Sequence, residues 1–371
     1  MTERAAYILF NMMEGIGPVR IRSLIEALGS IEAILEADEA ALQRGHRVGP
    51  ELVRSIVAQR NALDPIAEQE KAERCGARIV TPIDTDYPDP LRTIYDPPLA
   101  LYVRGTLTPK DRHAIALIGS RRTTHYGRSV ADRLAYQLGK VGYVVVSGLA
   151  RGIDTAAHQG ALKAGGRTLA VLGGALDRFY PPENRPLADA IAEQGAILSE
   201  FPFGREPDRT TFPMRNRIVS GLSMGVCVVE AGFKSGALHT VDDALEQGRA
   251  VFAVPGRIDS SASRGAHQLL KNGARLVEDV DDILKEFEFL VPSDKQRAEP
   301  HLTARPEVQL SAEEQAIVKA LWPGEQDVDA LARLAELPSA RISALLIGLE
   351  MKKVVRMLPG RVVELIARDN P

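Results

Sequence analysis

The densest group of side chains able to bind a phosphate lies in the segment FPMRNRIVSGLS, residues 212–223, which contains Arg215, Asn216 and Arg217. Pro213 is typical of a first helical position, so we expect these three residues in the first turn of a helix, where cations oppose the helix dipole. Side chains two residues apart on a helix point about 200° apart. We therefore expect one arginine to face an anion and the other to hold the protein together.

A second group of phosphate-binding candidates precedes this segment in the sequence. GSRRTTHYGR, residues 119–128, has three arginines and no acid, and its first residues are Gly119, Ser120 and Arg121. Guanidinium forks and the N–H groups at a helix N-terminus both bind phosphates. The segment is not G-x-G-x-x-G, and no acid is placed to bind a ribose, so dinucleotide binding is not expected. The alternative is that the arginines lie on a solvated face.

Glycines and aromatic rings complete this set of candidates. Ser147-Gly148 begins the run SGLARGIDTAAH, in which Gly148 lets the backbone approach a ligand. Phe201, next to Glu200, and Phe212 offer rings for base stacking. His158 has no partnered nucleophile nearby in the sequence, so we expect it to pack or hydrogen-bond rather than to catalyse.

Short apolar runs alternate with longer amphipathic ones between residues 76 and 290, and the amphipathic stretches include 130–139 and 153–164. This rhythm predicts an α/β domain with a parallel, doubly wound sheet, whose ligands bind beyond the carboxyl ends of the strands. The phosphate-binding candidates follow those ends. The expected strands are 114–118, 143–147, 168–172, 196–198, 226–230 and 250–254.

Two flanking domains and a linker are also expected. Residues 1–75 are helical in pattern, and the Gly-x-Gly turn at Gly15 and Gly17 resembles a helix-hairpin-helix element; the alternative is a plain turn or a protein contact, because acids outnumber bases there. Residues 291–309 are polar and read as a linker. Residues 310–371 show three amphipathic segments followed by two short runs, as in a winged helix, but their charge is balanced, which favours a protein-contact or regulatory role.

The composition sets limits on function. The chain has 371 residues, a net charge of −3 and 45% hydrophobic residues. Any anion site must therefore be a local patch. Cys75 and Cys227 form neither a disulfide framework nor a zinc pattern, and Cys227 lies in a run that we expect to be buried. We expect no metal, no cofactor and no membrane span, and a cytoplasmic protein.

The ordered runs GSRRTTHYG, SGLARGIDTAAH, AVLGGALDRFYPPEN, SEFP, FPMRNRIVSGLS, VVEAGFKSGALHT and EQGRAVFAVPG resemble the motif set of the DprA/Smf family. The resemblance implies an extended Rossmann-like domain between a SAM-like N-terminal domain and a winged-helix-like tail. It implies a non-enzymatic homodimer that binds single-stranded DNA and loads the RecA recombinase in natural transformation. The expected DNA-binding residues are Gly119, Ser120, Arg121, Ser147, Gly148, Glu200, Phe212, Arg215, Asn216 and Arg217.

Two departures from the family pattern matter. His267 stands where the family usually has Asn, so a local hydrogen bond is expected to differ. Asp243, three residues after Thr240, resembles the acid of a related nucleotide-hydrolysing family. A nucleoside-monophosphate hydrolase with Asp243 or Glu230 as its acid therefore remains an alternative, and a pure scaffold is a third.

Overall fold

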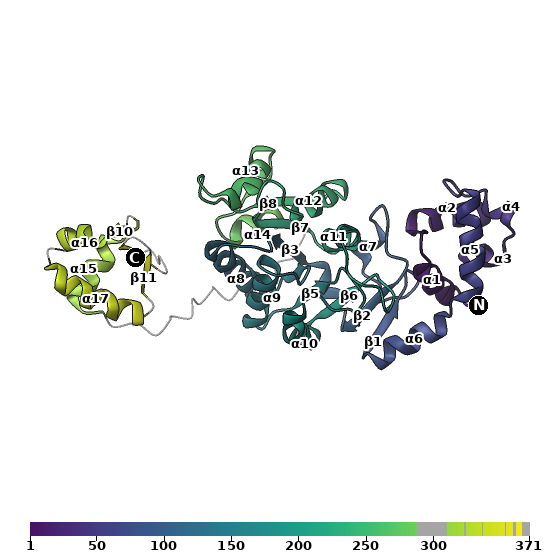
Figure 1. The fold of residues 1–371 in the computed structure, drawn as a ribbon, viewed down its shortest axis with the longest axis horizontal. Helices are drawn as coiled ribbons and strands as arrows, with labels where there is room; N and C mark the ends of the chain where they lie inside the picture. Colours follow the sequence, from purple (N-terminus) through teal and green to yellow (C-terminus); the bar gives the residue numbers. More distant parts are fainter. Residues whose placement is uncertain (288–309, 323, 336, 353, 359–360, 366–371) are drawn as a thin grey trace. The chain divides into compact units, whose positions relative to one another are not determined.

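The chain folds into two compact units, Met1–Pro292 and Ser293–Pro371, in the computed structural model (Figure 1). The structure describes residues 1–287, 310–322, 324–335, 337–352, 354–358 and 361–365. The predicted linker, 291–309, lies outside the described residues. Each unit has its own hydrophobic core, so each is described by itself.

A nine-stranded sheet forms the centre of the first unit, in the order β1-β2-β6-β5-β4-β3-β7-β8-β9. The strands from β6 to β9 in this order pair in parallel, whereas β1 pairs antiparallel with β2, and β2 with β6. The strands are β1 (Ala77–Val80), β2 (Leu101–Gly105), β3 (Ala114–Gly119), β4 (Val144–Ser147), β5 (Thr168–Val171), β6 (Ala196–Ser199), β7 (Gly225–Glu230), β8 (Ala250–Ala253) and β9 (Arg275–Leu276).

All six predicted strands are present, within one or two residues of the expected bounds, and the Rossmann-like parallel core is confirmed. The strands β1, β2 and β9 were not predicted. In β1 and β2 an arginine interrupts a short apolar run: Arg78 pairs with Asp86, and Arg104 pairs with Asp189. The antiparallel edge therefore lacked the uninterrupted apolar pattern of the buried strands.

Helices cover both faces of the sheet (Figure 1). The side chains of α8, α9, α10 and α14 pack on one face, and those of α7, α11 and α12 on the other. The helices that follow β1 in this unit are α7 (Asp89–Arg92), α8 (His125–Lys140), α9 (Ile153–Lys163), α10 (Arg185–Gln194), α11 (Thr211–Gly221), α12 (Ala237–Glu246), α13 (Arg264–Lys271) and α14 (Val280–Phe287), with 3-10 turns η1 (Pro109–Arg112), η2 (Pro182–Asn184) and η3 (Ser261–Ser263).

The first 74 residues are helical and contain no strand, as predicted. Gly17 and Gly49 each precede a proline that begins a helix, an arrangement that suits the fixed φ of proline. Glu68 ties this segment to the sheet, because its buried carboxylate accepts hydrogen bonds from the Tyr102 hydroxyl and the Phe203 N–H. The helices are α1 (Glu3–Met12), α2 (Pro18–Leu28), α3 (Ile31–Glu36), α4 (Glu39–Leu42), α5 (Pro50–Ala62) and α6 (Pro65–Arg74).

The second unit has the winged-helix order expected from the sequence. Its elements are α15 (Ala312–Ala320), β10 (Gln326–Asp327), α16 (Val328–Leu334), α17 (Ser339–Met351), β11 (Val355–Leu358) and β12 (Val362–Leu365). A three-stranded antiparallel sheet in the order β10-β12-β11 packs with the helices around one small core. Among the described residues of both units, no helix is long and apolar enough to cross a membrane.

The separate cores predict that the first unit is stable alone. We expect a chain ending at Pro292 to unfold cooperatively, because the first unit keeps its own core. The midpoint of its main thermal transition should stay within about 2 °C of that of the full chain, a shift smaller than one ordinary substitution causes. Calorimetry of the full chain and the shortened chain measures this. A broad, non-cooperative transition in the shortened chain would contradict the division into two units.

Candidate functional site

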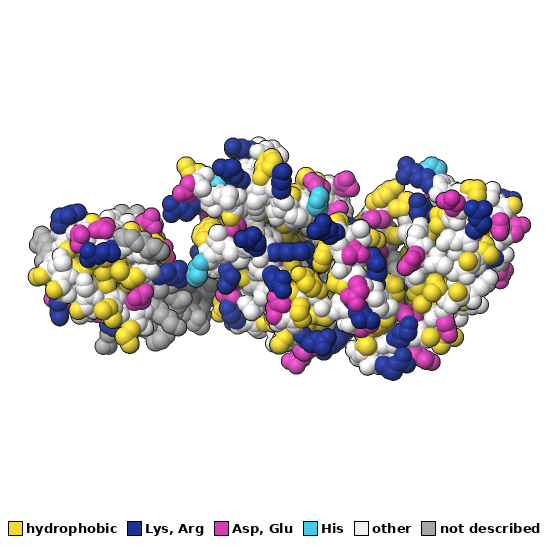
Figure 2. Space-filling view, in the orientation of Figure 1, with side chains coloured by type: hydrophobic (Ala, Val, Ile, Leu, Met, Phe, Trp, Pro, Cys, Tyr) yellow, Lys and Arg dark blue, Asp and Glu magenta, His cyan; other side chains and the backbone are white. Residues whose placement is uncertain are grey.

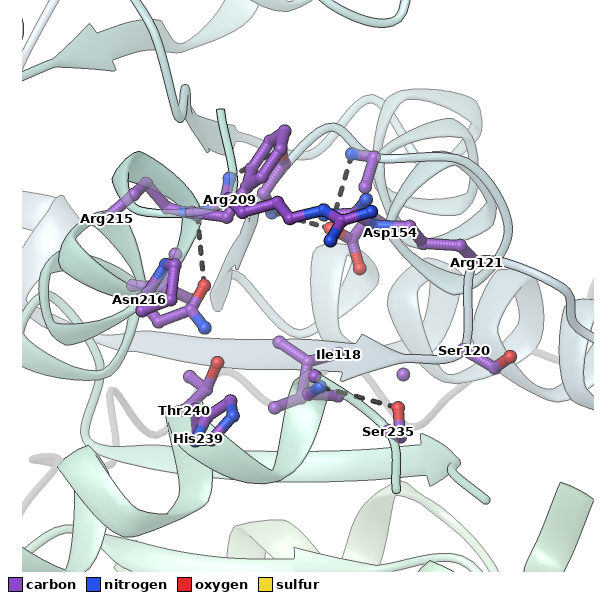
Figure 3. Close-up of a pocket in the computed structure, with 18 of the residues that line it drawn as sticks. Ile118, Ser120, Arg121, Asp154, Arg209, Arg215, Asn216, Ser235, His239 and Thr240 are labelled. Atoms are coloured by element: carbon purple, nitrogen blue, oxygen red, sulfur yellow. Dashed lines mark hydrogen bonds between the residues drawn. The ribbon is translucent and has the colours of Figure 1, made fainter. Parts of the chain in front are cut away.

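A pocket of about 480 Å³ opens at the carboxyl ends of the central strands (Figure 3). The lining consists of residues 118–122 at the end of β3 and just after it, residues 148, 150 and 154 between β4 and the first turn of α9, residues 209, 212, 213, 215, 216 and 219 in α11 and just before it, and residues 235–237, 239 and 240 at the start of α12. The lining contains four arginines, at positions 121, 122, 209 and 215, and a single carboxylate, Asp154. Figure 2 shows Lys and Arg side chains gathered over the middle of this unit.

Arg215 forms the floor of the pocket. Its guanidinium group donates hydrogen bonds to the carbonyl oxygens of Gly148, at 2.7 Å, and Val171, and its Nε donates to the Asn216 side chain at 3.2 Å. Burial lowers the pKa of Arg215 to about 10, against the opposing effect of Asp154, so the group stays charged at neutral pH. A buried cation bonded to neutral oxygens favours an anion nearby.

Asp154 is also buried and, like Arg215, is hydrogen-bonded to the backbone of Gly148. Both residues line the pocket (Figure 3). Its carboxylate accepts hydrogen bonds from the backbone N–H groups of Gly148 and Ala150, at 3.2 and 3.3 Å, and so fixes the turn after β4. Burial raises the pKa of this carboxyl, although Arg215 and Arg121 lower it. Asp154 thus shapes the pocket and offsets one of its positive charges.

A larger residue at position 148 would displace the floor of the pocket, because an added Cβ there would collide with the Arg215 guanidinium group. The neighbouring Ser147 is completely buried, and its hydroxyl donates to the Leu117 carbonyl, so its side chain supports the turn from below. Ser147 does not line the pocket.

Arg121 is exposed at the rim of the pocket and lies over the half-buried Phe212 ring, with Cζ 4.4 Å from the ring centroid. Arg121 is not paired with Glu200 or Asp154: Glu200 binds Arg217, and Asp154 binds backbone N–H groups. Arg121 can therefore turn its guanidinium group to a ligand without breaking an ion pair.

Three of the backbone N–H groups around this turn are already engaged. Ser120 donates to the Glu230 carbonyl, Arg122 to the Ser120 hydroxyl, and Thr124 to the Glu230 carboxylate. The Thr123 and Thr124 hydroxyls donate to the same carboxylate at 2.8 Å. Glu230 thus occupies the position at the start of α8 where a phosphate was expected, and guanidinium groups remain as the anion-binding groups here.

Arg215 and Arg217 point to different surroundings, as their spacing predicted. Arg217 lies outside the pocket lining and bridges the buried Glu200 carboxylate and Asp96, the latter at 3.0 Å. Helix α11 begins at Thr211, where Asp208 accepts hydrogen bonds from backbone N–H groups. The prediction that the arginines lie in its first turn was wrong, because the helix begins two residues before Pro213.

Seven of the ten predicted DNA-binding residues line the pocket: Gly119, Ser120, Arg121, Gly148, Phe212, Arg215 and Asn216. Ser147, Glu200 and Arg217 lie outside it. Phe201 is 6% exposed and packs in the interior, so it offers no face for stacking. Sequence reasoning missed Arg209 and the segment 235–240; the position of that segment directly after a predicted strand was the available signal.

Other expectations from the sequence are settled by packing. His158 is fully buried, its Nδ1 lies 2.7 Å from the Thr168 hydroxyl, and burial lowers its pKa to about 3, which confirms a packing role. Cys227 is buried as predicted, and burial raises the pKa of its thiol to about 12. His267 bonds to the backbone of Gly256. No group of acids, cysteines and histidines suited to a metal occurs among the described residues.

A family model described as DNA recombination-mediator protein A matches residues 78–288, the part of the chain that builds the pocket. The chain belongs to the DprA/Smf family. Models described as a SAM-like helix-hairpin-helix tandem and a DprA winged helix domain match residues 8–61 and 301–361, in agreement with the fold.

Individual relatives agree with the family. Protein Smf of Synechocystis sp. is 33% identical over 390 aligned residues, which cover 97% of this chain and 98% of that protein. The structure of DNA processing protein A from Streptococcus pneumoniae superposes with a TM-score of 0.68 at 36% identity, covering 78% of this chain and 99% of that one. DNA processing protein A from Helicobacter pylori, whose structure is described for its single-stranded DNA binding mode, gives a TM-score of 0.51 at 30% identity, covering 58% of this chain and 98% of that one.

The different surroundings of the arginines predict different effects on stability. Arg217→Ala leaves the Glu200 carboxylate buried without its partner, so we expect the free energy of unfolding to fall by about 3–5 kcal/mol. Arg121→Ala removes only an exposed cation–π contact and is expected to cost about 1 kcal/mol or less. Urea unfolding of both variants measures this, and equal losses would contradict the assignment of Arg217 as a structural residue.

Proposed function

We propose that this chain binds single-stranded DNA in the pocket at the carboxyl ends of its strands and delivers it to the RecA recombinase in natural transformation. The observation that carries the proposal is the pocket itself: four arginines surround one buried carboxylate, and a half-buried phenylalanine ring lies among them. Guanidinium groups bind the phosphates of the strand, and the ring of Phe212 stacks with a base. The description of the H. pylori relative supports this ligand.

The same pocket argues for binding without catalysis. The two acids considered for a hydrolase, Asp243 and Glu230, do not line it. Glu230 is 3% exposed and engaged with Thr123 and Thr124. Asp243 is half-buried near Asp96, and burial, with that neighbouring acid, raises its pKa to about 6. We propose that both acids are structural and that the protein is a mediator rather than an enzyme.

RecA and a second copy of this chain are proposed as partners from the family resemblance. For the winged-helix unit we propose a protein contact rather than a DNA contact. The exposed side chains of α17 include Ser343, Ala344, Ile347 and Met351, which have no charge, and the acidic Glu350. Arg341, on the same helix, is paired with Glu313. A helix that binds DNA normally presents basic side chains to it.

The proposal predicts the preferred form of DNA. We expect the protein to bind single strands at least about tenfold more tightly than duplex, because base stacking on Phe212 requires unpaired bases, and to lose affinity steeply as salt rises. A salt-titrated shift assay with both forms measures this. Equal affinity for the two forms would contradict the proposal, and release of free base from nucleoside monophosphates would support the hydrolase instead.

Arg121 is the sharpest single-residue test of phosphate binding. Arg121→Ala is expected to weaken binding of single strands by about 1.5–3 kcal/mol and to reduce the salt slope by about 0.7, the share of one phosphate. Arg121→Lys should restore the slope better than the affinity, because lysine supplies charge without the fork.

The control for this test is Arg54→Ala, which removes an exposed arginine of α5 outside the pocket. We expect this variant to bind like the unaltered protein. An unchanged salt slope in Arg121→Ala would remove Arg121 from the phosphate contacts.

A further inference from the structure

A row of four side chains, two aromatic rings between two arginines, leads out of the pocket over its rim. Arg121 lies over Phe212, with Cζ 4.4 Å from the ring centroid, and Phe212 contacts Tyr180, with 6.2 Å between centroids and a tilt of 57°. Arg151 follows, with Cζ 5.5 Å from the Tyr180 centroid. Only the first two of these residues line the pocket, so the row continues its surface toward η2.

Tyr180 and Arg151, the outer pair of the row, are held in place by hydrogen bonds but are not buried. The Arg151 guanidinium binds both carboxylate oxygens of Glu183 and donates to the Tyr180 hydroxyl at 3.2 Å. Tyr180 nevertheless stays 41% exposed. The ring is therefore fixed in position and remains accessible at the surface.

The two ends of the row differ in charge, so they suit different parts of a nucleotide. At the pocket end, Arg121 has no carboxylate partner in the described ion pairs and is available to a phosphate. At the outer end, Glu183 neutralises Arg151. The outer end therefore offers an aromatic surface without net charge, which suits a base rather than a phosphate.

We propose that Tyr180, positioned by Arg151 and Glu183, is a second base-stacking platform, which takes the nucleotide next to the one that stacks on Phe212. This inference rests on the proposed binding of single-stranded DNA and extends its site by one base beyond the pocket. A single strand suits the row because two neighbouring bases can stack on the adjacent rings of Phe212 and Tyr180, while a phosphate contacts Arg121 at the pocket end.

The test compares strands with and without bases. Oligothymidylate of about twenty nucleotides and an abasic strand of equal length are titrated against the full chain, Tyr180→Ala and Tyr180→Phe. We expect Tyr180→Ala to bind oligothymidylate about tenfold more weakly, as for the loss of one stacked base. Its affinity for the abasic strand and its salt slope should be unchanged, because the ring carries no charge.

Two controls separate stacking from a structural role. Tyr180→Phe keeps the ring and loses only the hydroxyl, so it should bind like the unaltered chain. Tyr95→Ala removes another exposed tyrosine that contacts an arginine, Arg22, outside the pocket, and should also have no effect.

The outcomes distinguish this inference from the proposal beneath it. Unchanged binding of oligothymidylate by Tyr180→Ala would overturn the platform, and so would an equal loss on both strands, which would indicate a distorted pocket. Failure of the unaltered chain to bind either strand would overturn the proposed function itself, and the platform with it.

Discussion

The site depends on one buried charge, the guanidinium group of Arg215 beneath the pocket. Its hydrogen bonds to the carbonyl oxygens of Gly148 and Val171 join the carboxyl ends of β4 and β5 to helix α11. These oxygens hold the cation in place without neutralising it, and Asp154, which binds the N–H of the same Gly148, offsets part of its charge. A charge kept out of water in this way acts over the whole pocket, so the positive potential comes from the floor as well as from the exposed arginines at the rim.

A second ion-pair group keeps that arrangement rigid. Arg217 binds Glu200 and Asp96, which joins α11 to the ends of β6 and α7 on the side away from the pocket. Two arginines separated by one residue thus have separate functions, because a step of two residues along a helix turns the side chain to nearly the opposite side. Glu230 has a comparable effect at α8, where its carboxylate holds the helix start and leaves the binding of anions to side chains.

The sequence predicted the parallel sheet and the edge at which the pocket lies, because buried parallel strands are continuous apolar runs and ligands bind at their carboxyl ends. It did not predict the antiparallel edge, where Arg78 and Arg104 interrupt the pattern. Nor could the sequence show which of two residues of the same type is buried. The sequence predicted the same stacking role for Phe201 and Phe212, yet Phe201 is in the interior and Phe212 lines the pocket. Such differences arise from tertiary packing, which residue type and spacing do not encode.

A crystal structure of the full chain with a short oligothymidylate tests the central claim most directly. The account predicts a phosphate within hydrogen-bonding distance of Arg121, in the pocket above Arg215, and a thymine ring stacked on Phe212. The remaining nucleotides should leave the pocket over its rim. A strand bound to the winged-helix unit or to the N-terminal helices, with the pocket empty of phosphate, would contradict it.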